Sequence, residues 1–215
     1  MPEAESGLME KTVSGIYLVT EPCSDLLERV EIALQRGVGI VQYREKDPSA
    51  KDRLVTACRL RVRCRKHRAL FIVNDDPLLA LKCEADGVHL GQGDRSPAAA
   101  REMLGEGALI GVSTHCLDEA VAAERDGADY IGFGCLFPTR TKGDTTPASL
   151  EELARVRKAV SIPVVAIGGI DASNLASAIR AGADSAAVIS AIMQAKHCRA
   201  AVNELLRQYR LGKAI

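Results

Sequence analysis

The sequence predicts a single-domain α/β protein folded as a (β/α)8 TIM barrel, and three observations support this class. Short runs of β-branched residues alternate with Ala- and Leu-rich stretches of helical length, as in repeated βα units around a parallel sheet. About eight such strand runs fall within 215 residues, which suits a compact barrel. A Gly-Ala-Asp triplet or a close relative lies just before three strands, at 85–87, 127–129 and 182–184. A doubly wound open sheet is the alternative, because periodicity alone does not close a barrel.

The expected strands are short runs, many of which end in Gly, Asn, Asp or Thr. They span 15–20, 40–45, 70–74, 87–90, 109–113, 130–134, 163–168 and 186–190. The expected helices lie between and after them, at 24–36, 49–67, 77–83, 96–104, 116–126, 149–159, 172–181 and 191–209. Three of these helices begin near a residue that favours helix N-termini, namely Ser24, Ser149 and Asp171.

One domain is expected, with an N-terminal extension at 1–12, the barrel at 13–210 and a C-terminal tail at 211–215, because no Pro/Gly/Ser-rich linker divides the chain. The 28 basic residues balance 28 acidic ones, which argues against sequence-independent binding to nucleic acid or to a membrane surface. The start lacks a secretory pattern, and no apolar run approaches the ~20 residues of a membrane span. The seven cysteines form no Cys-x-x-Cys pair. A cytoplasmic protein with reduced cysteines is therefore expected.

Polar residues follow the second predicted strand, where a TIM barrel carries its active site. Strand alternation places Gln42, Arg44 and, if the extension persists, Lys46 on one side of the chain. Two cations and an amide would then converge on the barrel mouth. The alternative is that Arg44 and Lys46 are solvated charges paired with Glu45 and Asp47.

Carboxylates follow the next two strands and predict a metal site. Asp75 and Asp94 are the candidates, because Mg²⁺ is commonly held by one or two carboxylates together with substrate phosphate oxygens. Asp76 precedes a proline and is expected to cap a helix instead. His89 lies within a strand and is expected to be packed or hydrogen-bonded rather than a ligand.

Later strands offer groups for binding anions and rings. Ser113 ends strand five and could donate to or accept from a heteroaromatic ring. The loop after strand six holds Thr139, Arg140, Thr141 and Lys142, which suit a phosphate clasp, although a polar surface loop is the alternative. Strands seven and eight end near Gly169 and Ser190, where barrels often bind phosphate through backbone amides. Two phosphorylated ligands would thus face each other.

Seven motifs in order, VQYREK, VNDD, GVHLGQGD, GVSTH, FPTRTK, AIGGI and VISAI, resemble the thiamine phosphate synthase family. The resemblance covers roughly residues 13–195, and the ordered set is far more specific than any single motif. One departure is Cys135, where the family usually has proline, so the fixed φ of proline is absent from the approach to this loop.

The resemblance implies a Mg²⁺-dependent transferase that joins a hydroxymethylpyrimidine pyrophosphate to a thiazole phosphate. It implies that Asp75 and Asp94 hold Mg²⁺ and that Arg44, Lys46, Ser113 and Lys142 are catalytic. The implied pyrimidine pyrophosphate site comprises Gln42, Arg44, Lys46, Asn74, Ser113 and Lys142, with Tyr43, Glu45 and Arg140 as further substrate-binding positions. The implied thiazole phosphate site comprises Thr139, Thr141, Gly169, Ile189 and Ser190.

The family's mechanism is dissociative: pyrophosphate leaves, and the thiazole nitrogen attacks the pyrimidine methylene cation. A thiazole tautomerase would need a proton-transfer residue in place of a pyrophosphate site, and the carboxylates and Lys142 argue against it. An inactive ligand-binding barrel of the same pathway is the non-enzymatic alternative. Whether the chain forms a homo-oligomer is left open by the sequence.

Overall fold

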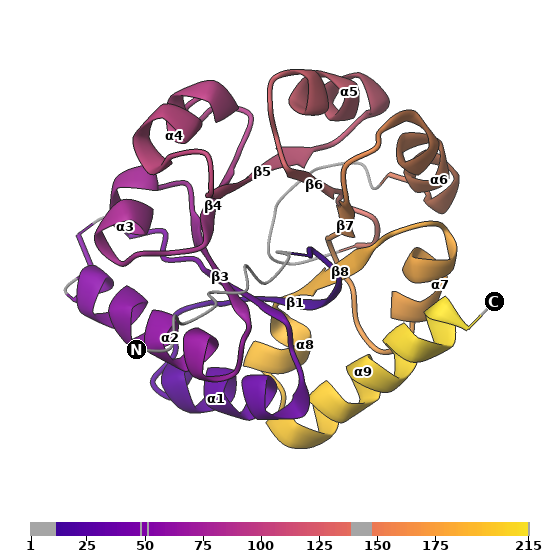
Figure 1. The fold of residues 1–215 in the computed structure, drawn as a ribbon. Helices are drawn as coiled ribbons and strands as arrows, with labels where there is room; N and C mark the ends of the chain where they lie inside the picture. The colour runs from indigo at the N-terminus through magenta and orange to yellow at the C-terminus, as the bar shows by residue number, and fades with distance from the viewer. Residues whose placement is uncertain (1–11, 48, 51, 139–147, 215) are drawn as a thin grey trace, which may run out of the picture.

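The computed structural model describes residues 12–47, 49–50, 52–138 and 148–214, and these residues form a closed barrel of eight parallel strands (Figure 1). The strands are β1 Gly15–Val19, β2 Ile40–Tyr43, β3 Leu70–Asn74, β4 Gly87–Leu90, β5 Leu109–Thr114, β6 Tyr130–Phe133, β7 Val164–Ala166 and β8 Ser185–Val188. Each strand pairs with the next, and β8 pairs back with β1, with Gly15 opposite Ser185. The expected TIM barrel is confirmed, and the open sheet is wrong.

Helices surround the barrel in chain order (Figure 1). They are α1 Leu26–Arg36, α2 Arg53–Lys66, α3 Pro77–Lys82, α4 Pro97–Leu104, α5 Leu117–Arg125, α6 Leu150–Ala159, α7 Leu175–Arg180, α8 Ser190–Met193 and α9 Cys198–Lys213. None of these described helices is long and apolar enough to cross a membrane.

The single helix expected at 191–209 is wrong, because the chain turns between α8 and α9. Arg29 of α1 donates to the carbonyl oxygens of Ile192 and Ala195, at 3.2 and 2.9 Å, and so satisfies backbone groups at this turn. Helix α9 then continues to Lys213, past the boundary expected at residue 210.

Only one of the three expected caps has the predicted role. Ser149 forms a capping box with Glu152 at the start of α6. Helix α1 begins at Leu26 and α7 at Leu175, so Ser24 and Asp171 lie too early to cap them. Asp171 instead accepts a hydrogen bond from the backbone N–H of Ser173, a local turn that competes with helix formation.

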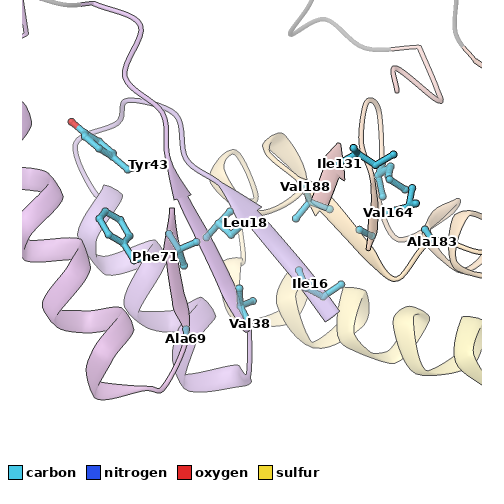
Figure 2. Packing of buried hydrophobic residues seen from close by; sticks show 14 of the residues in the cluster. Ile16, Leu18, Val38, Tyr43, Ala69, Phe71, Ile131, Val164, Ala183 and Val188 are labelled. Atoms are coloured by element: carbon cyan, nitrogen blue, oxygen red, sulfur yellow. The ribbon is translucent and has the colours of Figure 1, made fainter. Parts of the chain in front are cut away.

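The apolar residues divide into two clusters that follow the two-residue alternation of the strands. The larger cluster lies between the barrel and its helices and includes Leu18, Phe71 and Tyr43 (Figure 2). The smaller cluster includes Tyr17, Ile40, Ile72 and Tyr130, which alternate with outward-facing residues on their strands. This second cluster fills the barrel interior and forms the floor on which the site is built.

The Gly-Ala-Asp triplet or its close relative occurs three times, and in each case its Asp forms a hydrogen bond with the strand before it. Asp86, Asp129 and Asp184 accept hydrogen bonds from the backbone N–H groups of Phe71, Ile110 and Val164. Each carboxylate also pairs with an arginine of the helix before that strand, namely Arg61, Arg101 and Arg157. The repeat is therefore structural: it fixes the start of β3, β5 and β7 at the end of the barrel opposite the expected site.

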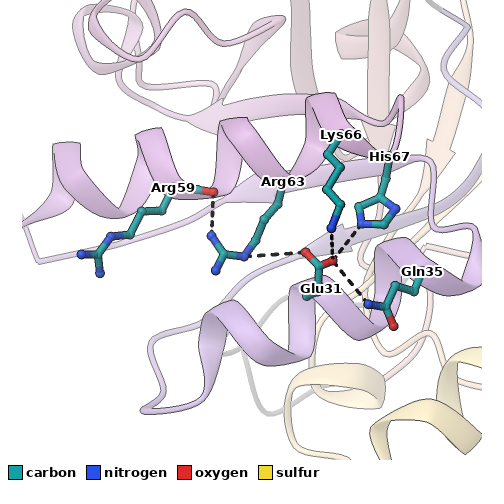
Figure 3. A network of polar contacts seen from close by, with 6 residues as sticks. All are labelled: Glu31, Gln35, Arg59, Arg63, Lys66 and His67. Carbon is teal, nitrogen blue, oxygen red and sulfur yellow. Dashed lines mark hydrogen bonds and ion pairs between the residues drawn. The ribbon is translucent and has the colours of Figure 1, made fainter.

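A polar network on the outer surface joins α1 to α2 (Figure 3). Glu31 of α1 contacts Arg63, Lys66 and His67 at 3.7, 3.4 and 2.9 Å. The hydrogen bond with His67 and the charge of Lys66 lower the pKa of Glu31. Exposed ion pairs of this kind contribute at most about 1 kcal/mol each, so we assign the network to helix docking and not to the site.

Candidate active site

A cavity opens at the carboxyl end of the strands, with an empty volume of about 980 Å³ that includes open solvent. Residues from all eight strands line it. The predicted site residues that line it are Gln42, Arg44, Asn74, Ser113, Gly169, Ile189 and Ser190. The structure therefore brings residues 148 positions apart in the sequence (190 − 42) into one cavity.

Three predicted residues at the end of β2 or just after it do not line this cavity. Tyr43 alternates with Gln42, so its ring lies in the cluster between barrel and helices and is only 5% exposed (Figure 2). Strand β2 ends at Tyr43, and the extension needed to bring Lys46 beside Arg44 does not persist. Lys46 is exposed, and Glu45 accepts a hydrogen bond from the backbone N–H of Asp47.

Thr139, Arg140, Thr141 and Lys142 lie outside the described residues. The described residues before this loop are anchored at the cavity: Leu136 and Phe137 donate their backbone N–H groups to the carbonyl oxygens of Ile167 and Gly168. After the loop, Ala148 donates its N–H to the carbonyl of Cys135 at 2.7 Å. Both ends of the loop are thus attached to the β6–β7 side of the mouth.

Asp75 and Asp94 are not among the residues that line this cavity, but they lie close enough to each other to interact. Burial, followed by the charge of Asp94 and a hydrogen bond with it, raises the pKa of Asp75 to about 6, whereas Asn74 and Arg44 act in the opposite direction. Asp75 has a φ of 63°, which is uncommon outside glycine and costs backbone energy. Its backbone N–H donates to the carbonyl of His89 at 2.8 Å, which fixes this conformation.

This donor set fits a hard divalent cation. Two adjacent carboxylates repel one another, and the charge of a bound Mg²⁺ would offset this repulsion. No group of three or more His, Cys, Asp or Glu side chains suited to a metal occurs among the described residues, so a metal here needs other ligands. Asp76 is not part of the set: it accepts the N–H of Leu79 and caps α3, as predicted.

The glycines after β7 allow the loop after β6 to pass close by. Gly168 and Gly169 have φ values of 98° and 64°, in the region that favours glycine. A Cβ on Gly169 would lie 2.6 Å from the carbonyl oxygen of Pro138. The glycine pair therefore shapes the mouth by close backbone packing, in addition to any contact with phosphate.

Sequence reasoning missed a row of buried polar groups beneath the cavity. Tyr17, Tyr130 and His89 connect Gln42 on β2 with Ser113 on β5 through side-chain hydrogen bonds. Burial raises the pKa of both tyrosines, so both phenols are neutral. His89 is hydrogen-bonded within the barrel, as expected. His115 was also missed: it lines the cavity, and its Nδ1 lies 3.0 Å from a carboxylate oxygen of Glu119.

Gly111 leaves space for the rings of this row, so replacing it with a larger residue should destabilise the protein. A Cβ on Gly111 would lie 2.1 Å from Cζ of Tyr130 and 2.5 Å from Nδ1 of His89, both rings being buried. We expect Gly111→Ala to reduce the free energy of unfolding by about 1–3 kcal/mol or more through overpacking, measured by urea denaturation. Gly107→Ala is the control, since a Cβ there meets nothing within 4 Å. Equal losses in both variants would contradict the packing argument.

The sequence profile described as thiamine monophosphate synthase matches residues 16–192, which include all eight cavity-forming strands apart from the first residue of β1. The chain belongs to this family. The family and the fold, which the sequence predicted, are confirmed.

Thiamine monophosphate synthase relatives match most of the chain. The thiamine-phosphate synthase of Halorhodospira halophila is 46% identical over 207 residues, covering 94% of this chain and 97% of its own. The thiamine biosynthesis bifunctional protein ThiED of Geobacter sulfurreducens is 50% identical over 184 residues. That match spans 86% of this chain but only 38% of the bifunctional protein. The match with a thiamine-phosphate synthase of Synechococcus sp. spans 55% of that relative.

Among solved structures, the thiamine phosphate pyrophosphorylase from Pyrococcus furiosus is similar throughout. Its TM-score is 0.85 at 37% sequence identity, with 92% of this chain and 96% of that chain covered. A thiamine monophosphate synthase barrel is therefore present over nearly the whole described chain.

Proposed function

We propose that this chain condenses a hydroxymethylpyrimidine pyrophosphate with a thiazole phosphate, forming thiamine phosphate and releasing pyrophosphate. The observation that carries the proposal is one cavity lined by Arg44 and by Gly169 and Ser190, with the carboxylate pair Asp75 and Asp94 close enough to Arg44 for its charge to act on Asp75. These features suit two anionic ligands that meet in one space. Family membership supplies the reaction class.

Mg²⁺ is the proposed cofactor, with Asp75 and Asp94 as its protein ligands; when bound, it would neutralise charge on the pyrophosphate. Arg44 would bind pyrophosphate oxygens from the cavity wall. Lys46 and Lys142 are proposed to add positive charge beside the pyrophosphate. Because pyrophosphate gains charge as it leaves, cations positioned there stabilise the transition state.

The pyrimidine ring is assigned to the polar side of the cavity, where Gln42, Asn74 and Ser113 offer hydrogen-bonding groups. The thiazole phosphate is assigned to Thr139, Thr141, Gly169, Ile189 and Ser190. Val165, Ile167 and Ala187 also line the cavity and form an apolar wall. Such a wall excludes water from a reactive pyrimidine methylene cation, so the thiazole nitrogen is the nucleophile that reaches it.

We infer that the protein acts in the cytoplasm and that its binding partners are the two small-molecule substrates. All seven cysteines are free, including the pocket-lining Cys135, which suits a reducing compartment.

Mixing the purified protein with both phosphorylated substrates and Mg²⁺ tests the function directly. We expect thiamine phosphate and pyrophosphate in equal amounts, and loss of both after exhaustive chelation. Folded protein that yields neither product would refute the proposed reaction. Conversion of the thiazole substrate into an isomer without pyrophosphate release would point to the tautomerase instead.

Ser190→Asp should weaken binding of the thiazole phosphate. A carboxylate beside the phosphate raises the apparent KM for this substrate by about tenfold or more, because like charges about 4 Å apart repel by about 1–4 kcal/mol. Steady-state kinetics with each substrate varied in turn measures the effect. Ser190→Ala removes the hydroxyl without adding charge and is the matched control. A larger rise in KM for the pyrimidine pyrophosphate would exchange the two assigned sites.

A further inference from the structure

An unbroken row of hydrogen bonds crosses the barrel interior under the cavity. Nε2 of Gln42 donates to the hydroxyl of Tyr17 at 2.9 Å, and the hydroxyls of Tyr17 and Tyr130 are 2.9 Å apart. The Tyr130 hydroxyl lies 3.1 Å from Nδ1 of His89, and Nε2 of His89 lies 2.9 Å from the hydroxyl of Ser113. The row thus joins two side chains that both line the cavity.

The number of hydrogens available in the row determines which group donates in each hydrogen bond. Tyr17 and Tyr130 are 2% and 0% exposed, and each neutral phenol has a single hydrogen to donate. The Tyr17 hydroxyl has two partners among the described residues, the donating amide of Gln42 and Tyr130. Its hydrogen therefore goes to Tyr130, and the hydrogen of Tyr130 goes to Nδ1 of His89.

A neutral imidazole that accepts at Nδ1 carries its hydrogen on Nε2. Nε2–H of His89 then donates to the Ser113 oxygen, which leaves the Ser113 hydrogen free to be directed elsewhere. Two glycines leave room for the His89 ring, which indicates that the row is part of the fold. A Cβ on Gly111 would lie 2.5 Å from Nδ1 of His89, and a Cβ on Gly132 would lie 3.1 Å from its Cε1.

We propose that His89 is a positioning residue: held as the Nε2–H tautomer, it makes Ser113 present its hydroxyl hydrogen to the cavity. Ser113 then binds an acceptor of the ligand, a ring nitrogen or a phosphate oxygen. This inference rests on the proposed function only in naming that ligand as the pyrimidine pyrophosphate. The tautomer itself follows from the orientation of the Gln42 amide, whose Nε2 donates to Tyr17 at the other end of the row.

Two-bond ¹H–¹⁵N spectra of protein labelled in histidine test the tautomer without substrate or turnover. The chain has four histidines, and His89→Gln identifies the signal of His89 by its loss. We expect Nε2 protonated and Nδ1 unprotonated in the wild-type protein. Tyr130→Phe, which removes the donor to Nδ1, should produce a measurable share of the Nδ1–H tautomer. A wild-type His89 with the proton on Nδ1, or on both nitrogens, would overturn the proposal.

Calorimetry with the pyrimidine pyrophosphate and Mg²⁺, without the thiazole substrate, tests the consequence for binding. Loss of one oriented hydrogen bond should weaken this ligand by about 2–10-fold in Tyr130→Phe and leave thiazole phosphate binding unchanged. In a Ser113→Ala background, Tyr130→Phe should have no further effect, because Ser113 is the group through which it acts.

Tyr209→Phe is the matched control, since its hydroxyl also makes two hydrogen bonds, with the N–H of Gly15 and the carbonyl of Asp184, at the far end of the barrel. Equal weakening by Tyr130→Phe and Tyr209→Phe would reduce the row to a merely structural role. If Ser113→Ala binds the pyrimidine ligand normally, the assigned ligand is wrong, and the tautomer spectra still decide the role of His89 separately.

Discussion

Lys142→Ala is expected to lower kcat and kcat/KM together, by on the order of 10²–10³ in rate. Phe137 and Ala148, on either side of the loop after β6, donate hydrogen bonds to Gly168 and Cys135, which line the cavity, and Lys142 is one of the two cations of this loop. Pyrophosphate carries more charge on its leaving oxygen in the transition state than in the bound substrate. A cation beside that oxygen therefore stabilises the transition state more than the ground state, and its removal lowers kcat as well as kcat/KM.

Lys158→Ala is the control for this prediction. Lys158 is exposed near the end of α6, on the outside of the barrel, and its loss should leave both constants unchanged. Steady-state kinetics with both substrates compares the two variants. If Lys142→Ala turns over like Lys158→Ala, the leaving group is stabilised without Lys142, and a rise in KM alone would assign this lysine to ground-state binding.

Asp75→Asn should cause the second large effect, a fall in Mg²⁺-supported turnover on the order of 10²-fold or more, because a metal ligand and its charge are both lost. Asparagine tolerates the φ of 63° at this position as well as aspartate does, so the backbone is preserved. Without metal, the variant should be at least as stable as the wild-type protein, because the repulsion from Asp94 is relieved.

Thermal unfolding with and without Mg²⁺ separates these effects from misfolding. Mg²⁺ in the presence of pyrophosphate should raise the Tm of the wild-type protein and not that of Asp75→Asn. Asp76→Asn is the matched control: Asp76 caps α3 and pairs with Arg53 at 3.2 Å, and asparagine is also a good cap. It should retain both turnover and the response to Mg²⁺. Equal losses in the two variants would mean that the wrong carboxylate was assigned.

Local patterns in the sequence predicted much of the fold. The order of strands and helices, the cap at Asp76 and the capping box at Ser149 depend on residues within a few positions of one another. The two-residue alternation of a strand likewise placed Gln42 and Arg44 on one side of the chain, although Tyr43 was also expected among the substrate-binding positions. The single helix expected at 191–209 was wrong because the turn depends on Arg29, a residue distant in the sequence.

By itself, the sequence determined the class of fold, the family and the set of polar residues that follow each strand. Only the tertiary structure decided which of them meet: it directs Tyr43 away from the cavity and brings Asp75 to Asp94. It also placed Tyr17, Tyr130 and His89 in one row, although they lie on β1, β6 and β4. Barrel closure and strand register create these contacts, and no local pattern contains information about which side chains meet across an interior.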